Sequence, residues 1–168
     1  MSPDGTTSPT IHQTTHERIS EQSLLFTREF DAPRELVFRA HVEIELLSQW
    51  IGPPGAQMRV RSFDARSGGE WSYVIVGGGG REWAFFGSYH EVTAPTRIVH
   101  TWEFEEQAGH PTLETLSFVD LGDGRCRLEG ISSFPSVEDC TRMLESDLVG
   151  GMDTDHERLD ELLATVPR

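Results

Sequence analysis

Large aromatic side chains are the residues of this sequence best suited to bind a small molecule. Tryptophan and tyrosine combine a broad apolar face with a hydrogen-bond donor that can orient a polar group of a ligand. Trp71, Tyr73 and Ile75 recur at a spacing of two, so in a strand they form one wall. For each aromatic residue taken singly, ordinary core packing is the competing interpretation. The candidate aromatic contacts are Trp50, Trp71, Tyr73, Trp83, Trp102 and Phe118.

A second group of candidate contacts lies near the C-terminus, on an expected helix. Methionine is unbranched and polarisable, so Met143 and Met152 suit a cavity of irregular shape. Leu148 shares their apolar face, and His156, four residues after Met152, falls on nearly the same side. His156 is therefore a candidate polar contact. The alternatives are plain helix-to-sheet packing for the apolar residues and a surface or hydrogen-bonded role for the histidine.

No nucleophile motif accompanies these residues. The chain has no Gly-x-Ser-x-Gly elbow, no Ser-His-Asp order and no Cys-His signature. Catalysis would therefore have to be proton transfer by a buried carboxylate or histidine, for which Glu70, Glu91 and Glu103 in expected strands are candidates. Charged strand residues usually face water, so the catalytic residues stay unassigned.

The spacing of histidine and cysteine argues against a metal site. His90, His100 and His110 fall in separate strands or in a turn, with no i, i+4 pair and no carboxylate at ligand spacing. Cys126 and Cys140 are the only cysteines, and their separation fits neither a zinc site nor a disulfide framework. We therefore expect two reduced thiols, no metal and no cofactor.

The net charge argues against two classes of partner. Asp and Glu number 28 against 14 for Lys and Arg, a formal net charge of −14, so the field of the protein repels nucleic-acid phosphates and anionic membranes. No apolar run reaches the roughly 20 residues that span a bilayer, and the N-terminus has neither a basic start nor an apolar signal segment. We expect a cytoplasmic protein whose partner is a small hydrophobic molecule, and the sequence leaves a homodimer open.

The remaining pattern predicts one α+β domain over residues 23–168. Seven segments have the length and composition of strands, and the short links rich in Gly, Pro and Asp make successive strands antiparallel. Two short stretches with helical apolar spacing follow the first strand, and a long one closes the chain. The expected strands are 24–30, 57–64, 69–76, 82–92, 96–106, 111–121 and 124–133, and the expected helices are 33–40, 43–50 and the residues after Pro135.

The two ends of the chain carry more specific expectations. Residues 1–22 are rich in Ser, Thr, Pro and Gly and have no apolar period, which predicts a disordered tail. Ser136 and Asp139 form a capping pattern at the start of the closing helix. Gly150 and Gly151 predict a kink inside that helix. One helix cannot cover the concave face of so large a sheet, so side chains or a ligand must fill the remaining space.

Several stretches together resemble one known superfamily. In their order along the chain they are similar to the START-like (SRPBCC) superfamily, within it the branch named after the C-terminal domain of the activator of heat-shock protein 90 ATPase. The resemblance covers about residues 24–165, and Ile51 departs from it because many relatives have a second tryptophan there. The matching stretches are 47–53, 63–71, 86–92 with 97–102, and 151–152 with 157–163.

The resemblance implies a helix-grip fold, in which a strongly curved seven-stranded antiparallel sheet wraps around a long C-terminal helix and leaves a cavity between them. It implies no single activity, because its members include lipid and polyketide binders, cyclases, resistance proteins and co-chaperone domains. We expect binding of a lipid, aromatic or polyketide-like ligand in the cavity. One alternative is an enzyme of the cyclase, aromatase or hydrolase type. The other, a co-chaperone-like interaction module, is weakened because only 22 polar residues stand where the full activator has a further domain.

Overall fold

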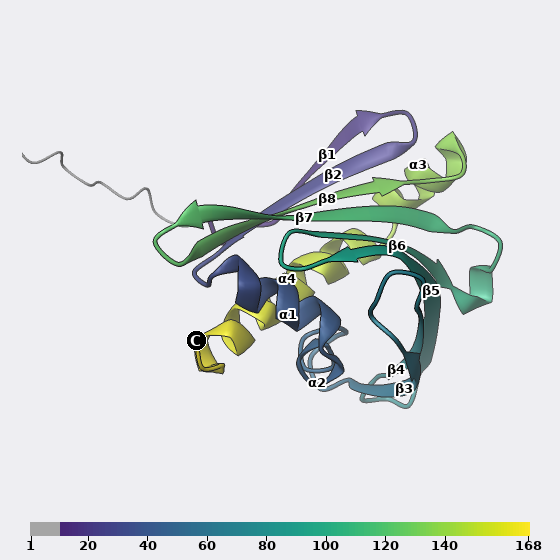
Figure 1. Ribbon diagram of the computed structural model, residues 1–168. Helices are drawn as coiled ribbons and strands as arrows, with labels where there is room; N and C mark the ends of the chain where they lie inside the picture. The colour runs from purple at the N-terminus through teal and green to yellow at the C-terminus, as the bar shows by residue number, and fades with distance from the viewer. Residues whose placement is uncertain (1–10) are drawn as a thin grey trace, which may run out of the picture.

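The computed structural model describes residues 11–168, which form an open antiparallel sheet of eight strands curved around a C-terminal helix (Figure 1). The expected α+β helix-grip architecture is confirmed, with eight strands instead of seven. No helix in this part of the chain is long and apolar enough to cross a membrane. The strands are β1 (Thr15–Ser20), β2 (Ser23–Phe30), β3 (Gln57–Phe63), β4 (Glu70–Val76), β5 (Glu82–Thr93), β6 (Arg97–Phe104), β7 (Thr112–Gly122) and β8 (Arg125–Ser133); the helices are α1 (Arg34–Val42), α2 (Ile44–Leu47), α3 (Val137–Glu145) and α4 (Leu148–Thr165), with a 3-10 turn at Glu105–Gln107.

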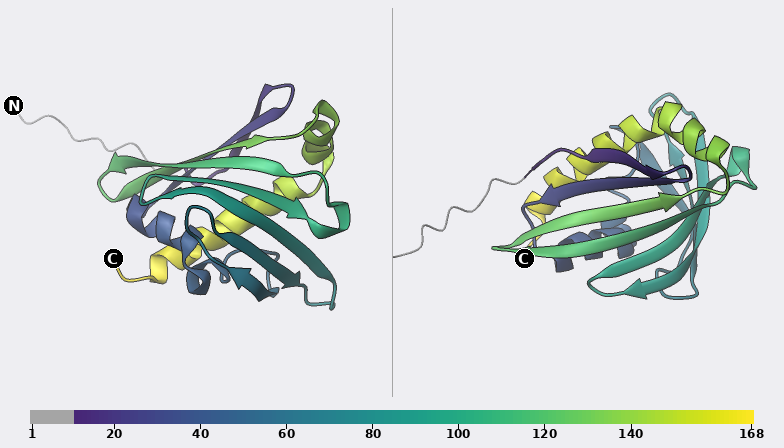
Figure 2. Two further views of the ribbon diagram at one scale, coloured as in Figure 1. Left: turned by 45° about the vertical axis from the view of Figure 1, so that its right-hand side comes forward. Right: turned by 90° about the horizontal axis from the view of Figure 1, so that it is seen from above.

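The sheet is an antiparallel meander that the first hairpin, β1–β2, extends at one edge. Its strand order is β1-β2-β8-β7-β6-β5-β4-β3. Strands β3 to β7 each pair with the next strand along the chain, as their short links predict. Strand β2 pairs with β8, and helices α1 and α2 occupy the connection between β2 and β3. Helix α4 runs across the concave face in both views of Figure 2.

The N-terminal segment differs from the expected tail over residues 1–22. Residues Thr15–Ser20 form strand β1, antiparallel to β2, at the edge of the sheet. Most of its side chains are exposed, but alternate residues from His12 to His16 hydrogen-bond through their side chains to one face of α4. Backbone pairing and polar contacts, instead of an apolar period, therefore order this segment. The first ten residues of the expected tail lie outside the described residues.

The closing helix breaks earlier than its glycines predict. Helix α3 ends before Ser146 and α4 begins at Leu148, whereas Gly150 and Gly151 lie inside α4, so the expected kink is misplaced. Ser146 is extended, with φ −89° and ψ 163°. Its hydroxyl donates to the Met143 carbonyl at 2.7 Å and accepts from the Leu148 N–H at 3.3 Å. The serine side chain thus takes over backbone groups that a continuous helix would use.

Helix α1 fills one end of the concave side. Its residues Leu36, Val37 and Phe38 are buried in one core with Leu159 and Leu163 of α4. The second helix is shorter than expected, because only Ile44–Leu47 are helical within 43–50. This core closes the end of the sheet near β7 and β8, and leaves space over the inner faces of β4, β5 and β6.

Candidate functional site

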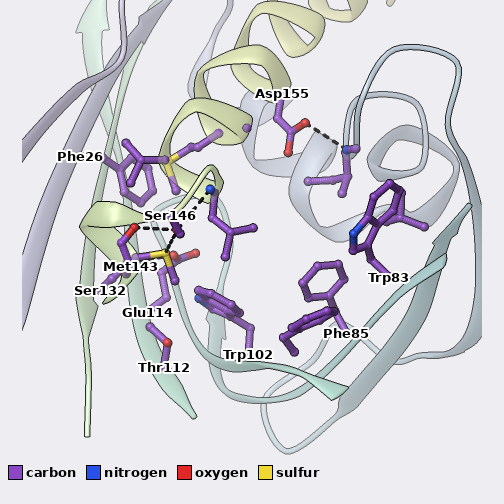
Figure 3. Close-up of a pocket in the computed structure, with 18 of the residues that line it drawn as sticks. Phe26, Trp83, Phe85, Trp102, Thr112, Glu114, Ser132, Met143, Ser146 and Asp155 are labelled. Carbon is purple, nitrogen blue, oxygen red and sulfur yellow. Dashed lines mark hydrogen bonds between the residues drawn. The ribbon is translucent and has the colours of Figure 1, made fainter. Parts of the chain in front are cut away.

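A cavity of about 840 Å³ lies between the concave face of the sheet and helices α3 and α4. Strands β4 to β8 form one side of it, the two C-terminal helices form the other, and the loop after α2 contributes a third wall. In Figure 3, Trp83, Phe85 and Trp102 of the sheet and Met143 of α3 face a common space. This volume falls within the roughly 300–1,000 Å³ typical of small-molecule sites.

Strand β4 forms an aromatic wall of the cavity. Trp71, Tyr73 and Ile75 all line it, as their spacing of two predicts. The rings of Trp71 and Tyr73 stack with their centroids 4.9 Å apart. Gly87 of β5 pairs with Trp71, and a Cβ at Gly87 would lie 2.8 Å from the Trp71 indole nitrogen. The missing side chain at position 87 therefore makes room for the indole.

The other three tryptophans reach the cavity from three different elements. Trp83 lies on β5, with the guanidinium of Arg81 5.0 Å from its ring centroid. Trp102 lies on β6. Trp50 follows α2 and is buried, and its indole N–H donates to the Ala40 carbonyl at 3.0 Å. All four tryptophans named from the sequence thus surround one cavity, although the donor of Trp50 is already used.

The helical side of the cavity carries the second predicted group, Met143, Leu148, Met152 and His156. The His156 side chain is buried, and its Nδ1 lies 2.8 Å from the Thr14 hydroxyl. Burial lowers the pKa of His156 to about 3, so the imidazole is neutral at pH 7. Its ring lines the cavity, but its Nδ1 is engaged by the N-terminal segment.

Phe118 alone among the predicted contacts lies outside the cavity lining. Its ring is buried and packs edge-on against Phe38 of α1, with centroids 5.2 Å apart, and against His41 at 5.1 Å. Helix α1 covers this part of the concave face, so an inward position here is ordinary core. The alternation of β7 shows which way Phe118 points, but cannot show which helix lies over it.

A polar row on the floor of the cavity is not among the residues predicted from the sequence. The register pairs His100 of β6 with Glu114 of β7, and Glu114 with Ser132 of β8. His100 Nε2 and Ser132 Oγ lie 3.0 and 3.2 Å from the two carboxylate oxygens of Glu114. Figure 3 shows Glu114 and Ser132 beside the open space. A signal exists in the sequence, because Thr112, Glu114 and Leu116 alternate on the inward face of β7.

Two further titratable groups line the cavity with shifted pKa values. Asp155 of α4 accepts a hydrogen bond from the Gly52 N–H at 3.0 Å. Burial raises the pKa of Asp155 to about 7, although the Gly52 hydrogen bond and the charge of Arg158 oppose this. His41 Nδ1 donates to the Val37 carbonyl at 2.8 Å, and burial lowers the pKa of His41 to about 4. Near neutral pH, His41 is therefore uncharged while Asp155 can gain or lose a proton.

The carboxylates considered from the sequence as proton-transfer groups do not line the cavity. Glu70 is exposed at the start of β4. Glu91 pairs with Arg97 at 3.2 Å, and Glu103 accepts from the Gly109 N–H at 2.8 Å. These strand carboxylates thus follow the general tendency of charged strand residues to face away from the buried side.

Both thiols are buried, and the potential metal ligands within residues 11–168 do not cluster. Cys126 and Cys140 are free and buried, and burial raises the pKa of Cys126 to about 12, which suppresses its thiolate form. Within residues 11–168, no three His, Cys, Asp or Glu side chains cluster in a way that could hold a metal ion.

The chain matches the family model described as activator of Hsp90 ATPase homolog 1-like protein over residues 31–164. No curated protein matches the chain. Solved structures of proteins from several bacteria are similar to it in fold. One from Rhodobacter sphaeroides is 24% identical, with a TM-score of 0.82, and the match covers 92% of this chain and 100% of that one.

Two further similar structures come from other bacteria. One from Mycobacterium smegmatis is 22% identical, with a TM-score of 0.79 and coverage of 95% of this chain and 100% of that one. One from Staphylococcus epidermidis is 26% identical, with a TM-score of 0.77 and coverage of 92% and 96%. At this similarity the fold is shared over nearly the whole chain, and the descriptions of these structures name no ligand or reaction.

Proposed function

This chain belongs to the activator of Hsp90 ATPase homolog 1-like family, and we propose that it binds a small hydrophobic molecule in the cavity between its sheet and helices α3 and α4. The observation that carries the proposal is the cavity itself. Protein interiors are close-packed and leave few voids larger than a water molecule, so a space of about 840 Å³ is far larger than packing defects produce.

The lining of the cavity indicates the class of ligand. Aromatic rings of Trp71, Tyr73, Trp83 and Trp102 form much of the surface on the sheet side, and Met152 lies opposite on α4. Apolar surface removed from water contributes about 25 cal/mol per Å², so a ligand that buries about 200 Å² gains about 5 kcal/mol before the cost of its immobilisation. A flat, apolar aromatic molecule therefore fits this lining best.

A matched pair of methionine variants tests the proposal. Met152 lines the cavity, whereas Met58 of β3 is also partly buried but does not. We expect Met152→Ala to weaken binding of the neutral fluorescent probe N-phenyl-1-naphthylamine about tenfold, because the ligand loses contact with roughly two methylene equivalents. Met58→Ala should leave the affinity unchanged. Equal affinities for both variants, or no binding by the folded wild-type protein, would refute the proposal.

A second candidate, an enzyme that uses the same cavity, is favoured by one observation. Asp155 lines the cavity with its pKa raised to about 7, which suits a group that gives and takes protons near neutral pH. An enzyme of this kind would lose turnover of a cavity-bound metabolite about 10²–10⁴-fold on Asp155→Asn while keeping its affinity. Unchanged turnover would remove Asp155 from consideration.

A further inference from the structure

Glu114 has unused hydrogen-bonding capacity inside the aromatic cavity. A carboxylate offers about four lone-pair positions, and here His100 and Ser132 occupy two of them. The side chain of Glu114 is only 13% exposed, and it lines the cavity. A carboxylate held in apolar surroundings is costly unless it is hydrogen-bonded, so its free positions favour a ligand that brings a donor.

His100 contacts Glu114 through only one of its two ring nitrogens. The Nε2 atom of His100 faces Glu114, while its Nδ1 is buried and has no hydrogen-bond partner within residues 11–168. A neutral ring that donates from Nε2 leaves only a bare lone pair at Nδ1. With its hydrogen on Nε2, His100 donates to the Glu114 carboxylate and holds it in place.

Within residues 11–168, no lysine or arginine forms an ion pair with Glu114 or is placed beside it to receive an anionic ligand. The chain contains no lysine, and within the described residues only Arg81 and Arg142 bring a guanidinium to the lining. Arg81 lies over the ring of Trp83. Arg142 donates to Asp139 at 3.0 Å and to Glu138 at 3.1 Å. Arg142 is thus engaged by two carboxylates. Arg81 is exposed in the β4–β5 link and lies far along β5 from Tyr89, the residue that pairs with His100.

Building on the proposed function, we propose that Glu114 selects the ligand: an aromatic molecule that presents a hydroxyl or amino hydrogen-bond donor to this carboxylate and carries no negative charge. The same arrangement rejects fatty acids and other carboxylates. A like charge held about 6 Å from Glu114, at an effective dielectric constant of about 20, reduces affinity about a hundredfold. His100 and Ser132 are positioning residues that hold the carboxylate in place.

Four ligands with the same naphthalene body separate the donor, the charge and the apolar contact. At pH 7, naphthalene has no polar group, 2-naphthol has a neutral hydroxyl, 2-naphthylmethylamine carries a positive charge and 2-naphthoate a negative one. Calorimetric titration of the wild-type protein should give at least one donor ligand about tenfold tighter than naphthalene, and 2-naphthoate at least tenfold weaker than naphthalene. Comparing the affinities of 2-naphthylmethylamine and 2-naphthol shows which donor the site prefers.

The Glu114→Gln variant removes the charge and keeps the side-chain shape. Its affinity for 2-naphthoate should rise about tenfold or more, and its affinity for the preferred donor should fall about three- to tenfold. Glu129→Gln is the matched control, because Glu129 lies on β8, pairs with Arg127 and does not line the cavity. It should leave every affinity within about twofold of wild type.

The outcomes separate this inference from the proposed function. If naphthalene and the donor ligands all fail to bind the folded wild-type protein, the proposed function itself fails. If the four ligands bind the wild-type protein equally, the hydrophobic site stands and the selection by Glu114 is refuted. Unchanged affinities in a folded Glu114→Gln variant refute it as well. If the Glu114→Gln variant does not fold, the affinities of the four ligands for the wild-type protein still test the selection by Glu114.

Discussion

The hydrogen bond between Thr14 and His156 provides a sharp test of how the N-terminal segment is anchored. Both side chains are buried, and Thr14 Oγ1 lies 2.8 Å from His156 Nδ1. The Thr14→Val variant keeps the β-branched shape and removes only the hydroxyl. Since the lowered pKa of His156 keeps its ring neutral at pH 7, the variant leaves a buried polar nitrogen without a partner.

The expected loss follows from the cost of an unsatisfied buried group. Leaving one such atom unpaired costs about 1–3 kcal/mol. For a chain of 168 residues, 1 kcal/mol corresponds to a change in melting temperature of about 2–4 °C. The melting temperature should therefore fall by about 4–8 °C if the cost is about 2 kcal/mol. Thermal unfolding followed by circular dichroism measures this change directly.

Thr15→Val is the matched control. Thr15 is the next residue, lies at the start of β1, and pairs through its exposed hydroxyl with Thr27. Removing this hydroxyl should change the free energy of unfolding by less than about 0.5 kcal/mol. Equal melting temperatures for the Thr14→Val and Thr15→Val variants would contradict the anchoring of the N-terminal segment by Thr14 and His156. They would instead support the disordered tail that the composition predicts.

Three further substitutions test other parts of the structure. Gly151→Ala should raise the free energy of unfolding in urea by about 1 kcal/mol, because position 151 is helical and a Cβ there meets nothing within 4 Å. An unchanged free energy of unfolding would contradict a continuous helix α4 at this position. Gly87→Ala should lower the free energy of unfolding by several kcal/mol, because the new Cβ would lie 1.8 Å from the Thr101 carbonyl oxygen. Gly78→Ala is the control, because a Cβ at position 78 meets nothing within 4 Å. Equal changes in the free energy of unfolding for the two variants would contradict the close approach at Gly87. Asp155 has its pKa raised from 3.8 to about 7, so its contribution to the free energy of unfolding falls as the pH rises between those values. Asp155→Asn should therefore gain about 4 kcal/mol relative to wild type over that window, and a pH-independent difference would contradict the shift.

Residue patterns predict most of the sheet correctly because strand period and turn chemistry are local. The segment expected at 24–30 is strand β2 (Ser23–Phe30), and the short glycine-containing links do join antiparallel neighbours. The cap is local as well: the Ser136 hydroxyl accepts from the Asp139 N–H at 3.0 Å, as the capping pattern predicts. Features that depend on a few consecutive residues are thus recoverable from sequence.

The features that were missed depend on contacts between distant residues. Strand β1 is ordered by pairing with β2 and by side-chain contacts to α4, about 140 residues later in the chain, which no local apolar period reveals. The cavity lining depends on where α1 stops covering the sheet, which is why Phe118 lies in the core. The alternation of β7 predicts that Glu114 points inward. Its role in the cavity depends on His100 and Ser132, which lie on the neighbouring strands and contact its carboxylate.

Localisation of a bound ligand by the methionine methyl signals tests the central claim most directly. The sequence has four methionines, of which Met143 and Met152 line the cavity and Met58 does not. With methyl-labelled methionine, the two-dimensional NMR spectrum gives a separate signal for each methyl group. Addition of 2-naphthol should shift the methyl signals of Met143 and Met152 and give nuclear Overhauser effects between these methyl groups and the protons of the ligand. The signal of Met58 should stay in place. Unchanged Met143 and Met152 signals at saturating ligand, or shifts confined to Met58, would contradict binding in the cavity.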